Sequence, residues 1–192
     1  MQIFDDFLDL DYAAQIEGLL CSSRFEWFFL NYGTCPKQMV DSFPQYAVND
    51  RPQLAHAFYT GDTVNSSHYP VVKHMIDILE RKTGTSYFPR LCRLKSNLLF
   101  QDSSFGKDDH HFPHTDDEDA VSLLYYVNDA DGDTFLFDQK DINDPLTLAH
   151  RISPKRNRAV LFNSSKLHAS SSPRLSKYRL VINIVFKNSQ VN

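Results

Sequence analysis

Hydrophobic and polar residues alternate along the chain with two different periods. Residues 11–20 and 71–79 place apolar side chains at helical spacing, whereas most of the chain after residue 86 alternates with a period of two. Pro70 suits the first turn of the second helix, and Gly84 suits its end. The pattern predicts two helices near the start of the chain and a β-rich remainder.

Short extended runs separated by polar turns predict the strands of this β-rich part. One further strand is expected earlier, near residues 53–60. Residues 128–132, Asn-Asp-Ala-Asp-Gly, predict a hairpin between two of the later strands. The later strands are expected at residues 89–100, 120–128, 133–138, 148–153, 158–163 and 177–187. Many short strands with outer helices predict a mainly β fold with flanking helices, either a β-sandwich or a jelly roll.

The composition fits one folded domain with a core of aromatic and β-branched side chains. The chain has 192 residues, of which 42% are hydrophobic, with 15 Phe and 9 Tyr but only 6 Gly. We therefore expect residues 1–192 to form a single domain. Residues 1–86 are expected to be a helical and loop support region, and residues 87–188 the β core.

Charge and cysteine usage narrow the classes of function. The net charge of −4 argues against a protein that neutralises a nucleic-acid backbone. Cys21, Cys35 and Cys92 are an odd number without a Cys-x-x-Cys pair, which disfavours a disulfide framework and a thiolate zinc site. The acidic start and the lack of an apolar run of about 18 residues predict a soluble, cytoplasmic protein without membrane contact.

A histidine and a carboxylate stand one residue apart near the middle of the chain. If the backbone is extended there, the side chains of His114 and Asp116 leave the same face. His168, between two expected strands, is the choice for a third ligand. Two histidines and one carboxylate hold Fe(II) while leaving three coordination positions open. The same ligands also suit catalytic zinc, and a solvated loop is the alternative without a metal.

The last expected strand carries an arginine on an inward face. Alternation places Arg179, Val181 and Asn183 on one side of this strand and an apolar series that starts at Leu180 on the other. An inward arginine needs an anion, and its planar guanidinium pairs well with a carboxylate. We therefore expect a bound acid near the metal.

Alternation in the neighbouring strands brings hydroxyl groups to the same pocket. Tyr126 and Thr134 both fall on the face that we expect to point inward. Together with Asn183 they join Arg179 as the candidate residues for binding the acid.

These residues occur in an order that resembles a known family. The order is His114-x-Asp116, Leu-Tyr-Tyr-Val-Asn at 124–128, Asp-Gly-Asp-Thr-Phe-Leu-Phe at 131–137, Ala-Val-Leu-Phe-Asn at 159–163, His168, and Tyr-Arg at 178–179. The chain from about residue 88 to 187 resembles the 2-oxoglutarate- and Fe(II)-dependent oxygenases, in particular the prolyl 4-hydroxylase-like branch with its small microbial and phage members. The resemblance implies a double-stranded β-helix, which is a distorted, cupin-like jelly roll, with the metal at one open end.

The resemblance also implies a role for each candidate residue. His114, Asp116 and His168 would bind Fe(II), while Arg179 and Tyr126 would bind the distal carboxylate of 2-oxoglutarate. The implied reaction consumes 2-oxoglutarate and O2, releases succinate and CO2, and hydroxylates an unactivated C–H bond. The resemblance to this family favours a prolyl residue of a protein or peptide as the substrate, and ascorbate is a further candidate cofactor.

Several alternatives stay open at this point. Lys95 and Asn97 are both candidates for assisting the metal-chelating end of 2-oxoglutarate. A zinc-dependent hydrolase is a second enzyme hypothesis, although the sequence has no His-Glu-x-x-His motif. A non-catalytic jelly-roll binding module is a third hypothesis. The acidic, histidine-rich segment 108–118 is expected to be either a lid beside the iron or a hydrated connection.

Overall fold

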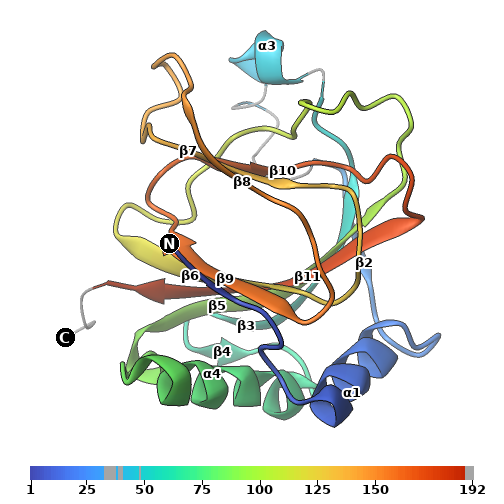
Figure 1. The fold of residues 1–192 in the computed structure, drawn as a ribbon, viewed down its shortest axis with the longest axis vertical. Helices are drawn as coiled ribbons and strands as arrows, with labels where there is room; N and C mark the ends of the chain where they lie inside the picture. Colours follow the sequence, from blue (N-terminus) through green and yellow to red (C-terminus); the bar gives the residue numbers. More distant parts are fainter. Residues whose placement is uncertain (33–37, 39–40, 48, 189–192) are drawn as a thin grey trace.

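The chain folds into two antiparallel sheets that face each other, with two helices on the outer side of the larger sheet (Figure 1). The structure is a computed structural model, and it describes residues 1–32, 38, 41–47 and 49–188. This arrangement is the double-stranded β-helix expected from the sequence.

Eight strands form the larger sheet and three form the smaller one. The larger sheet contains β1 (Gln2–Phe4), β2 (Phe28–Leu30), β3 (Gln53–Thr60), β4 (Thr63–Val64), β5 (Leu91–Phe100), β6 (Ala120–Tyr126), β9 (Arg158–Asn163) and β11 (Tyr178–Lys187). The smaller sheet contains β7 (Thr134–Phe137), β8 (Leu148–Ile152) and β10 (His168–Ser170). The strand orders are β1-β9-β6-β11-β5-β3-β2, with β4 paired to β3, and β10-β7-β8.

The strands predicted from the period-two pattern are all present, with ends that differ by at most two residues. The strands β1, β2, β4 and β10 were not expected, because two or three residues are too few to show a period. Three of these, together with β3, come from the first 86 residues, so this part of the chain completes the larger sheet as well as supplying the helices.

Both predicted helices are confirmed. They are α1 (Leu10–Leu20) and α4 (Tyr69–Thr83), and two shorter helical segments are α3 (Pro44–Ala47) and the 3-10 turn η1 (Phe88–Arg90). The Asp9 carboxylate accepts a hydrogen bond from the backbone N–H of Tyr12 at 2.8 Å and caps α1. Helix α4 ends at Gly84, whose φ of +69° is a conformation that favours glycine.

The main core lies between these helices and the larger sheet. On β11, the alternate residues Leu180, Ile182, Ile184 and Phe186 are at most 2% exposed and pack in this core. Each such side chain contributes about 1.5–3 kcal/mol by leaving water. The apolar face predicted for the last strand is therefore confirmed, and the opposite face of β11 is free to line a space between the two sheets.

The predicted hairpin at residues 128–132 is wrong, because β6 and β7 belong to different sheets. Asn128 donates to the Tyr178 carbonyl at 3.0 Å and accepts from the Leu180 N–H at 2.9 Å. Asp131 accepts from three backbone N–H groups of residues 174–176. These polar side chains bind the segment that leads into β11, so the turn carries the chain across from one sheet to the other.

Cys21 and Cys92 are free thiols, and Cys35 lies outside the described residues. Among the helices of the described residues, none combines the length and the hydrophobicity that a membrane span requires.

Candidate functional site

A cavity between the two sheets brings the sequence-predicted residues together. It encloses about 540 Å³, including the open space at its mouth. His114 and His168 line it, together with polar side chains that come from both sheets: Gln53, Lys95, Asn97, Thr134, Ser170, Arg179 and Asn183.

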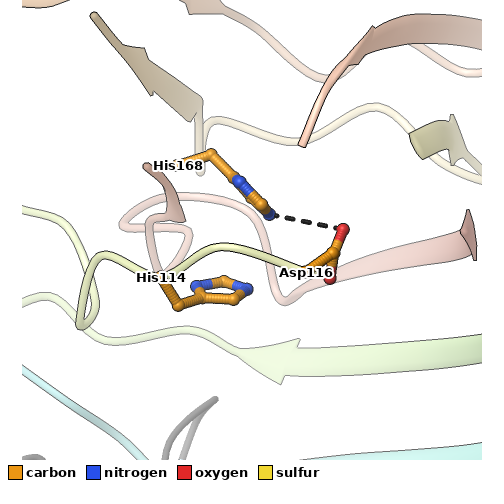
Figure 2. A group of neighbouring side chains, drawn as sticks. All are labelled: His114, Asp116 and His168. Atoms are coloured by element: carbon orange, nitrogen blue, oxygen red, sulfur yellow. Dashed lines mark ion pairs between the residues drawn. The ribbon is translucent and has the colours of Figure 1, made fainter. Parts of the chain in front are cut away.

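His114, Asp116 and His168 converge from two segments that are distant in the sequence, as Figure 2 shows. The backbones of His114 and His168 form an antiparallel bridge, with N–H to carbonyl distances of 3.0 and 2.9 Å. The Asp116 N–H donates to the Ser164 carbonyl at 2.9 Å, which fixes the end of the same segment. The three potential ligand atoms lie within 4.8 Å of one another, which suits one metal ion.

Backbone carbonyls orient both imidazoles for metal binding. Nδ1 of His168 donates to the Lys166 carbonyl at 3.0 Å, and Nδ1 of His114 donates to the Phe112 carbonyl at 3.4 Å. When a metal is bound, this tautomer would present the Nε2 lone pair of each ring as a ligand. Burial, together with the neighbouring His168, lowers the pKa of His114 to about 3 and keeps that ring neutral. The donor set therefore fits a divalent metal bound by two histidines and one carboxylate.

The Asp116 carboxylate has three polar neighbours. Oδ2 lies 3.5 Å from His168 Nε2 and accepts a hydrogen bond from the Ser122 hydroxyl at 2.5 Å, while Oδ1 accepts from Arg93 Nη2. Burial raises the pKa of Asp116, but hydrogen bonding to His168 and the charges of His168 and Arg93 outweigh it and hold this pKa well below its ordinary value. Asp116 is therefore ionised before a metal arrives.

Arg93 was missed as a functional residue by sequence reasoning. It shares the inward face of β5 with Lys95 and Asn97 at alternate positions, and this alternation was the available signal. The contact of the Ser122 hydroxyl with Asp116 was likewise not predicted from the sequence.

Arg179 lies at the other end of the cavity and is 2% exposed. Its Nε donates to the Gly132 carbonyl at 2.7 Å and its Nη2 to the Thr134 hydroxyl at 2.8 Å. Burial lowers the pKa of Arg179, although an arginine stays charged at neutral pH. Among the described residues no carboxylate forms an ion pair with it, so this buried cation has capacity for an external anion.

The remaining predicted residues divide into those that line the cavity and one behind its wall. Thr134 and Asn183 line it, and the Asn183 Oδ1 is buried without a hydrogen-bond partner among the described residues. Tyr126 is fully buried and donates its hydroxyl to Thr134 Oγ1 at 2.7 Å. Thr134 Oγ1 thus accepts from Tyr126 and Arg179 together, and Tyr126 orients the wall rather than lining the cavity.

The strand register relates the two ends of the cavity. Arg179, Val181, Asn183 and Val185 alternate along one face of β11. Val185 at one end of this row pairs with Arg93 on β5 and with Ser122 on β6, the two residues that contact Asp116. In the middle of the row, Asn183 pairs with Lys95. Asn183 and its partner Lys95 therefore lie between the metal ligands and the buried arginine.

Segment 108–118 is not a hydrated connection throughout. His111 and Phe112 are 2% and 0% exposed, and Phe112 packs in a second core on the outer side of the smaller sheet. His111 Nε2 lies 3.1 Å from the Ser172 hydroxyl, and burial lowers the pKa of His111 to about 3. The hydrated interpretation holds only for exposed residues such as Glu118.

Comparison with known proteins identifies the class that this fold and site define. Residues 100–187 match the family model described as the 2OG-Fe(II) oxygenase superfamily, and they contain the three candidate ligands and Arg179. The match covers less than half of the chain, and it shows that the β core is similar to the 2-oxoglutarate- and Fe(II)-dependent oxygenases, which are oxidoreductases. No curated protein sequence matches the chain.

Solved structures share the fold across nearly the whole chain. An oxidoreductase of the 2OG-Fe(II) oxygenase family from Burkholderia pseudomallei is 14% identical with a TM-score of 0.68, over 98% of this chain and 85% of that one. HygX from Streptomyces hygroscopicus, solved with nickel and 2-oxoglutarate, is 12% identical with a TM-score of 0.61, over 96% and 81%. A prolyl-4-hydroxylase from Pseudomonas putida is 15% identical with a TM-score of 0.51, over 98% and 92%. At these identities the similarity concerns the fold.

Proposed function

We propose that this oxygenase uses Fe(II), 2-oxoglutarate and O2 to hydroxylate an unactivated C–H bond. In the balanced reaction, R–H, 2-oxoglutarate and O2 give R–OH, succinate and CO2. The observation that carries this proposal is the buried, carboxylate-free Arg179, which lines the same cavity as His114 and His168, two members of the candidate metal group with Asp116. The binding-module and zinc-hydrolase hypotheses assign no role to this arginine.

The residues divide the binding of the cosubstrate between them. His114, Asp116 and His168 would hold Fe(II). Arg179 and Thr134 would bind the distal carboxylate, because a guanidinium and a hydroxyl are both hydrogen-bond donors to an anion.

Three further residues complete this assignment. Tyr126 would hold the Thr134 hydroxyl in place from behind the wall. Asn183 and Lys95, which lie between the two ends, would contact the middle and the metal-binding end of 2-oxoglutarate.

The chain itself contributes position and a restricted environment. When bound, Fe(II) supplies the redox chemistry that splits 2-oxoglutarate with O2 and oxidises the C–H bond. The two sheets exclude bulk water around the buried arginine, and the fixed imidazoles present Nε2 toward the metal position. Asp116 provides a carboxylate ligand, which favours hydroxylation over halogenation.

A prolyl residue of a protein or peptide is the proposed substrate, and ascorbate is the proposed reductant that keeps the metal as Fe(II). The structural similarity to a prolyl-4-hydroxylase over 98% of the chain supports this choice.

The test is untargeted. The Fe(II)-loaded protein is incubated with 2-oxoglutarate and a cell extract under 18O2, and the products that gain labelled oxygen are identified by mass spectrometry. Labelled hydroxyproline together with stoichiometric succinate is expected, whereas label in another residue or in a small molecule would redirect the substrate class. Metal analysis after anaerobic purification distinguishes iron from zinc, and a zinc-loaded protein that releases no succinate with added Fe(II) would contradict the proposal.

A further inference from the structure

Two side chains of the larger sheet hold both oxygen atoms of Asp116. Arg93 Nη2 donates to Oδ1, and the Ser122 hydroxyl donates to Oδ2 at 2.5 Å. The roles proposed above for cosubstrate binding use neither residue. Carboxylates that bind metals are commonly hydrogen-bonded to neighbouring groups that orient them, and Arg93 and Ser122 are placed to do this for Asp116.

The strand register places the two partners of Asp116 on either side of β11. Val185 pairs with Arg93 on β5 and with Ser122 on β6. Strands are about 4.8 Å apart, so roughly 10 Å separates the backbones of Arg93 and Ser122. The long arginine and the short serine therefore reach one carboxylate from different directions.

The guanidinium of Arg93 is committed to Asp116. The Asp116 side chain is 1% exposed and the Arg93 side chain is 30% exposed. Within the described residues, Asp116 is the one acidic partner of Arg93, and Arg93 Nε is buried without a hydrogen-bond partner. An arginine placed for general stability would be expected to satisfy more of its donors, because a buried unpaired N–H is costly.

The two oxygens of Asp116 have different neighbours. Oδ2 lies 3.5 Å from His168 Nε2 and faces the position where a metal would sit, whereas Oδ1 is paired with a positive charge. A carboxylate binds metal ions through one oxygen or through both. Binding through both would occupy one of the three positions that a two-histidine, one-carboxylate site leaves open.

We propose that Arg93 is a positioning residue that restricts Asp116 to a single metal-binding oxygen. By holding Oδ1, it keeps free the coordination positions that 2-oxoglutarate and O2 require. Ser122 assists by fixing the rotation of the same carboxylate. This inference rests on the proposed function, since it concerns the positions left for the cosubstrate.

The test compares the wild-type protein with Arg93→Met, Arg93→Lys and the control Arg158→Met, all loaded with Co(II) under argon. Arg158 forms a surface ion pair with Asp5 on the same sheet, so its loss leaves the metal site intact. The visible absorption of Co(II) reports its coordination number, and titration gives the dissociation constant of 2-oxoglutarate. Neither readout requires turnover.

For Arg93→Met we expect an altered Co(II) spectrum before 2-oxoglutarate is added and an affinity for 2-oxoglutarate lowered about tenfold, the scale of effects from partners of metal ligands. Arg93→Lys should keep the wild-type spectrum and an affinity within about threefold, because an ammonium group still pairs with Oδ1. If Arg93→Met does not fold, Arg93→Gln replaces it, since the shorter amide does not reach Oδ1.

Two results would overturn the inference alone: a wild-type spectrum and affinity in Arg93→Met, or no rescue by lysine. If the wild-type protein binds neither Co(II) nor 2-oxoglutarate, the proposed function fails first. The two failures are thus distinguishable.

Discussion

At the metal end of the cavity, the three candidate ligands project from the segment before β6 and from the short strand β10. At the other end, Arg179 belongs to β11, the ten-residue strand in the middle of the larger sheet. The ligands meet through a two-residue backbone bridge and a few side-chain contacts. Arg179 pairs with Leu99 of β5 and is fixed by Gly132 and Thr134.

The two ends of the cavity therefore differ in how far the protein alone, without metal or cosubstrate, fixes the positions of their side chains. At the arginine end the side chain is already positioned in the protein alone, because Arg179 donates to Gly132 and Thr134 without an anion. The metal end brings the neutral His114 imidazole, the His168 imidazole and one carboxylate together, and a metal ion would complete their interactions. Substitutions should therefore separate the two ends, with metal binding lost at one and cosubstrate binding lost at the other.

The largest effect is expected from Asp116→Ala. Removing one of three ligands should lower Fe(II) affinity by more than about 100-fold and leave no measurable succinate formation, since even the partners of ligands contribute 10–100-fold. Metal content after dialysis and succinate release measure both effects. The matched control is Asp119→Ala, an exposed carboxylate nearby that bonds Asn188. Wild-type iron content in Asp116→Ala would contradict the assignment of the metal end.

Arg179→Met should affect the opposite end. We expect the affinity for 2-oxoglutarate to fall about 100-fold, or about 3 kcal/mol, because a buried charge pair is lost. Fe(II) affinity should stay within about threefold of wild type. Calorimetric titrations of each ligand test the separation, with Arg174→Met, a half-buried loop arginine, as the control. Loss of metal binding in Arg179→Met would show that the ends are not independent.

Gly132→Ala should disturb the arginine end indirectly. A Cβ atom at this position would lie 2.4 Å from the Ser171 carbonyl oxygen, so the backbone must shift. Because the Gly132 carbonyl accepts the Arg179 Nε hydrogen bond, the shift should weaken 2-oxoglutarate binding about tenfold. The binding constant for 2-oxoglutarate is the measurement, and Gly18→Ala, at a position with open space around it, is the control. Unchanged binding in Gly132→Ala would mean that the arginine tolerates movement of its partner.

The last effect is on stability rather than on binding, and it concerns the response of His111, in the segment behind Arg179, to acid. The pKa of His111 is about 3 in the folded protein against an ordinary value of 6.5, so the unfolded chain binds an extra proton between these values. Stability should therefore fall as pH drops from about 6.5 toward 3. Between pH 7 and 5, His111→Gln should lose up to about 2 kcal/mol less stability than the wild type. Urea unfolding of the metal-free proteins at both pH values gives the difference, and equal losses would exclude this origin.

The same contrast explains how much could be predicted from the sequence. Leu180 and its alternate neighbours face the main core, and Arg179 faces the cavity, because alternation along a long strand fixes both faces. The spacing of His114 and Asp116 likewise predicted that their side chains leave the same face of the backbone, and the structure brings them into one group of potential ligands.

What could not be predicted depends on how segments meet. The contact of Arg93 with Asp116 requires the register of β5, β11 and β6, which no local pattern contains. The burial of His111 depends on its packing against Phe105 and Ser172. Its acidic neighbours in the sequence are typical of a hydrated segment, so they gave no sign of this burial. Residues 128–132 have a composition typical of a hairpin turn, but the side chains of Asn128 and Asp131 bind the segment that leads into β11 instead.

The most direct measurement is an anaerobic titration of the Fe(II)-loaded protein with 2-oxoglutarate, followed by its visible charge-transfer absorption. Chelation of the metal by the carboxylate and keto oxygens of 2-oxoglutarate should give an absorption that saturates at one equivalent. It should be absent in Asp116→Ala and should require a much higher concentration in Arg179→Met. A wild-type protein that binds Fe(II) but develops no such absorption, and forms no succinate when O2 is admitted, would contradict the assignment of this cavity to 2-oxoglutarate and iron.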